Sequence, residues 1–130
     1  MDTIRVGMIG FGANTRLRHA PGLLACPNVS LAAVCNRSLE STQKVASEFD
    51  IGKSYERWEQ VVEDPDIDAI CIGTWPYMHC PITLAALEHG KHVLTEARMS
   101  MDDLEARQMM EASERHPELV TQIVPSPLGM

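Results

Sequence analysis

The sequence of 130 residues predicts an α/β protein built on a doubly wound, parallel, six-stranded sheet. Short apolar segments alternate with amphipathic ones all along the chain, which is the order of a parallel sheet with helical crossovers. The apolar segments are nearly unbroken, as in residues 30–36, and this is typical of strands covered on both faces. A glycine-rich turn follows the first strand. Ligands of such a sheet bind at the carboxyl ends of its strands.

Six strands are expected in order along the chain. Ile4, Val6, Met8 and Ile9 form the first, and the others cover residues 30–36, 53–55, 67–73, 92–95 and 119–124. Five helices are expected between these strands. The first covers residues 13–24 and is interrupted by Pro21, the second is capped by Ser38 and ended by Gly52, and a short third one around Trp58 stops at Asp64-Pro65. The fourth covers residues 81–89, with Pro81 in its first turn and Gly90 after its end, and the fifth is opened by Ser100 and Asp103 and runs to about residue 116.

The turn Gly10-Phe11-Gly12-Ala13-Asn14-Thr15 predicts an anion site. Gly10 allows a sharp bend, and Gly12 has no Cβ to keep a pyrophosphate from the backbone. The first N–H groups of the helix then point at the phosphates. The third position of this fingerprint, normally Gly or Ala, is Thr15 here. The alternative is a glycine-rich turn that holds no ligand.

Charge is distributed unevenly along what we expect to be one domain over residues 1–130. The net charge of −7 disfavours a nucleic-acid partner. Residues 1–40 contain four basic and two acidic side chains, a balance of +2, whereas residues 41–130 contain seven basic and sixteen acidic ones, a balance of −9. The basic part, which includes Arg5, also carries the glycine turn, and this pattern suits a small polyanionic ligand.

No apolar run approaches the roughly 20 residues of a membrane span, and no secretory leader is visible, so we expect a cytoplasmic protein without a membrane partner. The four cysteines lack metal-binding spacing. Cys35 and Cys71 lie in apolar strands, where cysteine is commonly a small buried hydrophobe. We therefore expect reduced thiols and no metal.

Asn36 and Arg37 stand where the second strand meets its ligand. An acidic residue there would bind both ribose hydroxyls and repel a 2′-phosphate, which favours NAD. Asn36 carries no such charge, and Arg37 offers a planar, permanently charged group suited to phosphate. The pair favours NADP over NAD, although an arginine at a strand end can also be a plain surface charge.

Two further clusters follow the fourth and fifth strands. Thr74, Trp75, Tyr77 and His79 fall in a loop where they could flank the nicotinamide, or Trp75 and Tyr77 could simply pack the loop while His79 begins the next helix. Glu96 at the end of the fifth strand is a candidate site carboxylate, or an ordinary ion-pair partner of Arg98. His79 and Glu96 are the only catalytic candidates.

The chain resembles the N-terminal Rossmann domain of the glucose–fructose oxidoreductase, inositol dehydrogenase and MocA family. The resemblance rests on residues 6–12, on Asp64-Pro-Asp-Ile-Asp-Ala-Ile70, on Thr74 to His79 and on residues 85–96, which include Gly90-Lys-His-Val-Leu94. It implies NAD(P) binding and oxidation or reduction of hydroxyl compounds such as sugars and inositols. By resemblance, the pyrophosphate side is contacted by Phe11, Gly12, Ala13 and Asn14, the adenosine ribose by Asn36 and Arg37, and the nicotinamide end by Thr74, Trp75, Tyr77, His79 and Glu96.

The sequence departs from the family pattern in three ways. The family's Glu-Lys-Pro signature reads Glu96-Ala97-Arg98, so the lysine that helps to move the hydroxyl proton is missing. Trp75 stands where the family has proline. The chain ends at Met130, where family members continue into a second, substrate-binding domain, and we expect that domain to be absent. The resemblance thus predicts a cofactor-binding domain with weak or no turnover alone.

Two other interpretations stay open: a stand-alone regulatory module that senses a nucleotide, and a structural module without ligand. A surface left bare by a missing domain tends to drive association, so we also expect a homo-oligomer, with Met99, Met101, Leu128 and Met130 in the exposed patch.

Overall fold

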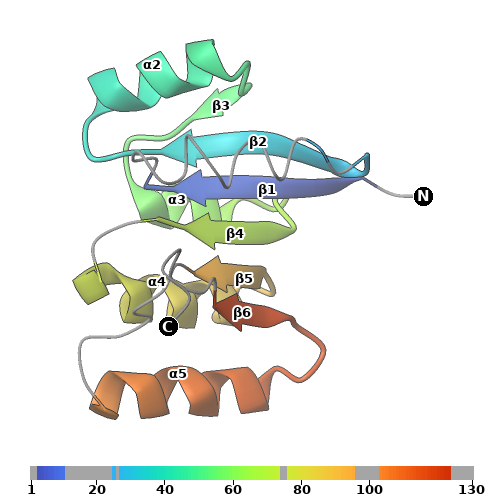
Figure 1. Ribbon diagram of the computed structural model, residues 1–130, viewed down its shortest axis with the longest axis vertical. Coiled ribbons are helices and arrows are strands. Elements are labelled where there is room, and N and C mark those ends of the chain that lie inside the picture. Colours follow the sequence, from blue (N-terminus) through green and yellow to red (C-terminus); the bar gives the residue numbers. More distant parts are fainter. Residues whose placement is uncertain (1–2, 11–24, 26, 74–75, 96–102, 124–130) are drawn as a thin grey trace.

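A single parallel sheet organises the computed structural model, which describes residues 3–10, 25, 27–73, 76–95 and 103–123. In this part of the chain the sheet has six strands in the order β3-β2-β1-β4-β5-β6, every neighbouring pair of which is parallel (Figure 1). The strands are β1 (Ile4–Ile9), β2 (Val29–Cys35), β3 (Lys53–Ser54), β4 (Ala69–Ile72), β5 (His92–Thr95) and β6 (Thr121–Ile123). The parallel, doubly wound α/β class predicted from the sequence is confirmed.

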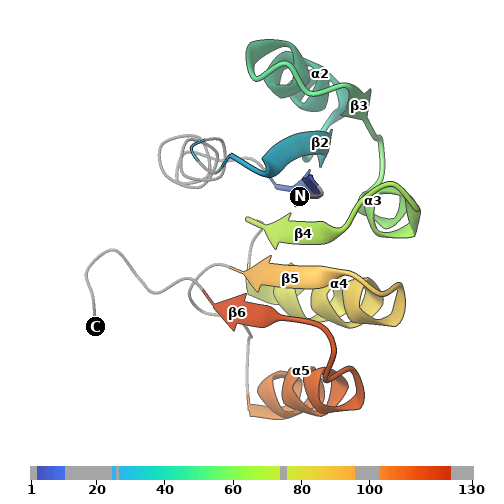
Figure 2. The same ribbon diagram turned by 90° about the vertical axis from the view of Figure 1, so that its right-hand side faces the viewer.

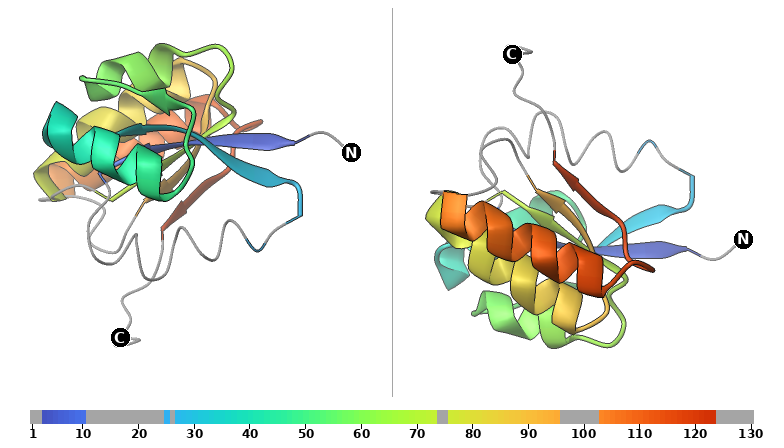
Figure 3. Two further views of the ribbon diagram at one scale, coloured as in Figure 1. Left: turned by 90° about the horizontal axis from the view of Figure 1, so that it is seen from above. Right: turned by 90° about the horizontal axis from the view of Figure 1, so that it is seen from below.

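Four helices connect these strands within the described residues: α2 (Leu39–Glu48), α3 (Trp58–Glu63), α4 (Pro76–Glu88) and α5 (Asp103–Arg115). Helices α3, α4 and α5 lie side by side on one face of the sheet (Figures 2 and 3). Helix α2 packs on the other face, where its Val45 joins a core cluster with Met8 and Val34. This arrangement follows from right-handed crossovers, because the chain moves outward from β1 to β3 and then outward on the other side from β4 to β6.

Alternating side chains of the strands fill two cores, one on each face of the sheet. Ile9, Ile70 and Ile72 pack with α3 and α4 on one face, whereas Met8 and Cys71 belong to the cluster on the α2 face. All five are at most 2% exposed. Strands buried on both faces explain the continuous apolar runs in the sequence.

One close contact fixes α3 against the sheet. A Cβ added at Gly7 would lie 2.5 Å from Cγ1 of Val61, closer than real Cβ contacts come. Only glycine at this position of β1 lets α3 approach so closely, and the pairing of β1 with β2 is also irregular here, between Val6 and Gly7.

Two helix boundaries differ from the sequence-based expectation. Helix α4 begins at Pro76, and Pro81, expected in the first turn, lies inside the helix. Pro76 is the better N-terminal proline because the missing N–H and fixed φ suit the first helical position. Gly52 does not end α2; the helix stops at Glu48, and Asp50 takes the left-handed conformation, with φ of 55°. Ser38 caps α2 as expected, accepting a hydrogen bond from Ser41 N–H, and Gly90 has the expected positive φ of 75°.

Candidate dinucleotide site

The carboxyl ends of β2, β1 and β4 meet at one edge of the sheet, on the side to which the arrowheads point in Figure 1. Backbone hydrogen bonds continue past the strand ends: Gly10 N–H donates to Cys35 O at 2.9 Å and Gly73 N–H to Ile9 O at 2.8 Å. The order of the strands reverses between β1 and β4, since β1 leads to β2 on one side and β4 leads to β5 on the other. Such a switch point is where open α/β sheets bind their ligands.

Gly10 gives this edge the backbone shape that the sequence predicted. Its φ is +78°, in the left-handed region that favours glycine, so the chain turns sharply as it leaves β1. Gly10 is the described part of the predicted phosphate-binding turn, and its positive φ is compatible with such a turn. Phe11, Gly12, Ala13 and Asn14 lie outside the described residues, as does the expected helix 13–24.

Asn36 is held in place from the first turns of α2. Its backbone N–H donates to Thr42 Oγ1 at 2.7 Å, and its side-chain Nδ2 donates to Ser41 Oγ, also at 2.7 Å. The Thr42 hydroxyl in turn donates to Ser38 O at 2.9 Å. Arg37, the residue after Asn36, is exposed. The structure therefore brings Asn36 and Arg37 to the carboxyl edge next to Gly10, whose N–H bonds the residue before Asn36.

The cluster after β4 is only partly described. Tyr77 and His79 belong to the first turn of α4, which begins at Pro76, and not to a loop. His79 is 1% exposed. Thr74, Trp75 and Glu96 lie outside the described residues, and so do the patch residues Met99, Met101, Leu128 and Met130.

Cys35 stands at the same edge but has no nucleophilic character. Burial, together with the negative charge of Glu59, raises the pKa of its thiol to about 11. The thiol is therefore protonated at neutral pH, when only the thiolate would react. Cys71 is also a buried thiol, as expected, and so is Cys80.

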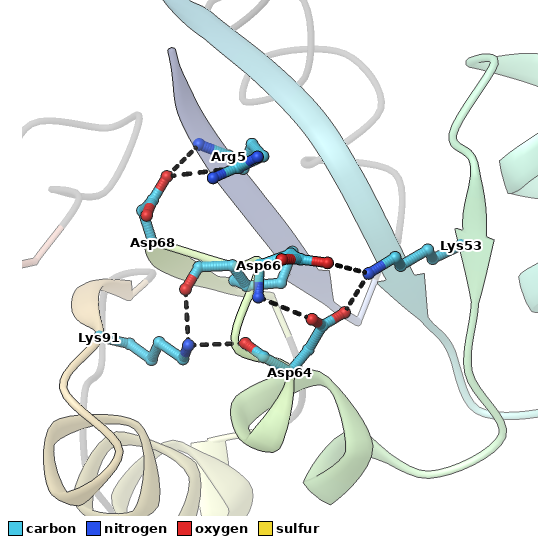
Figure 4. Close-up of polar contacts among 7 residues, drawn as sticks. Arg5, Lys53, Asp64, Asp66, Asp68 and Lys91 are labelled. Atoms are coloured by element: carbon cyan, nitrogen blue, oxygen red, sulfur yellow. Dashed lines mark hydrogen bonds and ion pairs between the residues drawn. The ribbon is translucent and has the colours of Figure 1, made fainter. Parts of the chain in front are cut away.

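A second polar cluster, which the sequence analysis did not predict, lies at the opposite, amino edge of the sheet (Figure 4). It is formed by Arg5, Lys53, Tyr55, Asp64, Asp66, Asp68 and Lys91, and we call it the amino-edge cluster. Lys91 is buried and donates from Nζ to two backbone carbonyls, Asp64 O at 2.7 Å and Ile67 O at 2.6 Å. It thereby satisfies carbonyl groups at the end of α3 and in the turn before β4.

Asp64 is the centre of this cluster. Its carboxylate accepts hydrogen bonds from Tyr55 Oη at 2.7 Å, from Lys53 Nζ at 2.9 Å and from Asp66 N–H at 2.8 Å. Burial alone would raise the pKa of Asp64, but these three hydrogen bonds and the charge of Lys53 outweigh it and lower the pKa to about 2. Burial lowers the pKa of Lys91, and this effect outweighs the negative charges of the nearby carboxylates, chiefly Asp64, which raise the pKa.

Arg5 does not contribute to a positive ligand site. Its Nε lies 3.8 Å from Asp68 Oδ2, and its backbone N–H donates to the same oxygen at 2.8 Å, at the amino edge. The net positive charge of residues 1–40 therefore does not place Arg5 near the predicted ligand, because Arg5 lies at the amino end of β1 and Gly10 follows its carboxyl end.

Within the described residues, no helix has the length and apolar character that crossing a membrane would require. Nor does that part of the chain contain a group of three His, Cys, Asp or Glu side chains placed to hold a metal ion.

Comparison with known proteins identifies the family. Residues 4–123 match the model of the GFO_IDH_MocA group, described as an oxidoreductase family with an NAD-binding Rossmann fold. The chain belongs to this family. The chain is accordingly an NAD(P)-binding domain of this oxidoreductase family, as the resemblance in the sequence predicted.

Individual members of the glucose–fructose oxidoreductase, inositol dehydrogenase and MocA family resemble the chain over most of its length. The 1,5-anhydro-D-fructose reductase of Ensifer adhaerens is 36% identical over 110 residues, which cover 84% of this chain and 32% of that protein. The 3-ketoreductase KijD10 of Actinomadura kijaniata, crystallised with NADP and TDP-benzene, is 26% identical with a TM-score of 0.85, over 93% of this chain and 37% of KijD10.

The fold itself also matches apo scyllo-inositol dehydrogenase of Lactobacillus casei, at a TM-score of 0.87 and 22% identity, over 94% of this chain and 36% of that one. The chain thus spans about a third of the length of the relatives it matches.

Proposed function

We propose that this chain is the NADP(H)-binding domain of an oxidoreductase that acts on a hydroxyl or carbonyl group of a sugar, polyol or related compound. The observation that carries the proposal is the carboxyl edge of the sheet, where Gly10 turns the backbone and Asn36 and Arg37 stand at the neighbouring strand end. The bound cofactor would supply the hydride acceptor or donor. Two relatives support this substrate class: the 1,5-anhydro-D-fructose reductase and the 3-ketoreductase KijD10, which was crystallised with NADP.

Each end of the cofactor has proposed partners in the chain. Gly10, Phe11, Gly12, Ala13 and Asn14 would hold the pyrophosphate, Asn36 and Arg37 the adenosine ribose, and Thr74, Trp75, Tyr77, His79 and Glu96 the nicotinamide end. With Ala97 where the family has lysine, we propose that the chain alone turns over weakly or not at all. Loss of a positioned acid or base commonly lowers a rate by about 10²- to 10⁴-fold.

We also propose that substrate contacts come from a second domain and that the chain associates into a homo-oligomer in the cytoplasm. Exposed apolar patches tend to drive association, and Met99, Met101, Leu128 and Met130 are the residues that we propose for such a patch. Sedimentation at rising protein concentration tests this proposal, and a monomer at all concentrations would count against it.

The preference for NADP depends on Arg37. The guanidinium of arginine pairs well with a phosphate, and Asn36 adds no negative charge to repel one. Replacing Arg37 by alanine should weaken NADPH binding by about tenfold, the equivalent of about 1.4 kcal/mol, and leave NADH binding within about twofold. Replacing Asn36 by aspartate should reverse the preference, because a carboxylate accepts both ribose hydroxyls and repels the 2′-phosphate.

Titration of NADPH and NADH against the purified chain, followed by nicotinamide fluorescence, measures both affinities. Arg107, exposed on α5, provides the matched control, and its replacement by alanine should change neither affinity. Equal loss of NADPH and NADH binding in the Arg37 variant would contradict the phosphate assignment. Binding of neither cofactor to the wild-type chain would contradict the proposed function itself.

A further inference from the structure

Arg37 lies between two residues whose backbone groups are bonded to one buried side chain. Thr42, near the start of α2, is fully buried. Its Oγ1 accepts a hydrogen bond from the backbone N–H of Asn36 at 2.7 Å and donates one to the backbone carbonyl of Ser38 at 2.9 Å. The residues directly before and after Arg37 are therefore both tied to Thr42.

The two bonds of the Thr42 hydroxyl differ in kind. The bond to Ser38 O stays within the start of α2, because threonine in a helix commonly donates to the carbonyl four residues earlier. The bond from Asn36 N–H instead joins the helix to the residue that follows β2. Because Thr42 is shielded from water, solvent competes little for this bond, and the segment 36–38 is fixed before a ligand arrives.

We propose that Thr42 is a positioning residue for the recognition of NADP: its hydroxyl fixes the backbone on both sides of Arg37, so that the guanidinium is presented to the 2′-phosphate of the cofactor. The proposal rests on the proposed function, since it assigns Thr42 a role toward the same ligand. Arginine has a long side chain with many rotamers, and a fixed backbone at its base reduces the entropy that is lost when it pairs with a phosphate.

The ratio of the NADPH and NADH affinities separates this role from a purely structural one. Thr42→Val keeps the approximate size of the buried side chain and removes its hydroxyl. We expect it to weaken NADPH binding about fivefold, less than the loss of Arg37 itself, and to change NADH binding by less than about twofold. A structural role would lower both affinities or neither and leave the ratio as in the wild type. Thr42→Ser, which keeps the hydroxyl, should restore the wild-type ratio.

A double-mutant cycle tests whether Thr42 acts through Arg37. If it does, Thr42→Val has no further effect on NADPH binding once Arg37 is alanine. The same loss of NADPH affinity in the Arg37→Ala background overturns the inference.

Thr83 in α4 provides the matched control. It is also fully buried, and its Oγ1 has no hydrogen-bond partner among the residues that the structure describes. Thr83→Val should therefore bind both cofactors as the wild type does. A change in the NADPH-to-NADH ratio in this variant as well overturns the inference, because loss of any buried threonine hydroxyl would then suffice.

Hydrogen exchange of the wild-type chain keeps the inference testable even if Thr42→Val does not fold. The amide proton of Asn36 should exchange slowly without cofactor, because its bond to Thr42 is already formed. Exchange as fast as that of an exposed, unbonded amide overturns the inference. An unchanged NADPH-to-NADH ratio in folded Thr42→Val also overturns it while the proposed function stands, whereas a wild-type chain that binds neither cofactor overturns both.

Discussion

Replacing Asp64 by asparagine removes the charge on which three donors of the amino-edge cluster converge. The carboxyl group is 3% exposed as a side chain, and its pKa is lowered from an ordinary value of 3.8 to about 2. At 1.36 kcal/mol per pH unit, the difference between these pKa values corresponds to about 2 kcal/mol of folding free energy at neutral pH. We expect the variant to lose about this amount.

The pH dependence gives the sharper test. Because the pKa of Asp64 is lower in the folded state than in the unfolded chain, its ionised form stabilises the fold above pH 3.8, and this contribution disappears as the pH falls toward 2. In that window, unfolding of the wild-type chain takes up a proton at Asp64, and unfolding of Asp64→Asn does not. Urea unfolding from pH 6.5 down to the lowest pH that leaves the protein folded measures both slopes.

Asp66 provides the control. Its side chain is 63% exposed and pairs with the same Lys53 at 3.1 Å, so it is a surface ion pair worth roughly 0–1 kcal/mol. Asp66→Asn should therefore lower stability little and leave the acid slope in place. The reasoning is refuted if Asp66→Asn is as destabilising as Asp64→Asn, or if the stability gap between Asp64→Asn and the wild type is the same at pH 6.5 and below pH 3.8.

Three other substitutions test the packing and the turn through their free energies of unfolding. Lys91→Met leaves two carbonyl groups without their donor and should lose about 3 kcal/mol; a loss near zero would show that water replaces the lysine. Gly10→Ala places a Cβ at a φ of +78° and should lose about 1–2 kcal/mol, while Gly52→Ala, with open space around its Cβ, should lose much less. Gly7→Ala should lose about 1–3 kcal/mol by crowding, and Val61→Ala in the same chain should recover part of that loss; additive losses would contradict the contact.

Most of the fold could be predicted because its strands are recognisable one at a time. Residues 92–95, for example, form β5 within the predicted bounds. Gly90 before this segment and polar residues after it leave little room for the strand to begin or end elsewhere. The start of α4 was harder, because two prolines in one helix, Pro76 and Pro81, offer two possible first turns, and tertiary packing decides between them. After α2, the left-handed conformation is taken by Asp50 and not by Gly52. Aspartate tolerates this conformation, and the local sequence pattern does not show which of the two residues adopts it.

The amino-edge cluster could not be derived from the sequence, although every residue in it was visible. Lys91 and Asp64 are 27 positions apart, and only the return of β5 beside β4 brings them together. One signal was available: a lysine between a helix-ending glycine and a buried strand stands where helix carbonyls need donors. The site edge was easier to predict, because parallel strands place Gly10 and Asn36 at neighbouring ends whatever the details of packing.

The central claim is that a dinucleotide binds at the carboxyl edge of the sheet, and mapping by NMR tests it most directly. Addition of NADPH to the ¹⁵N-labelled chain should shift the backbone amide signals of Gly10, Asn36 and Gly73 and leave those of Asp66 and Asp68, at the amino edge, unchanged. Shifts confined to the amino edge, or none at saturating NADPH, would contradict the claim.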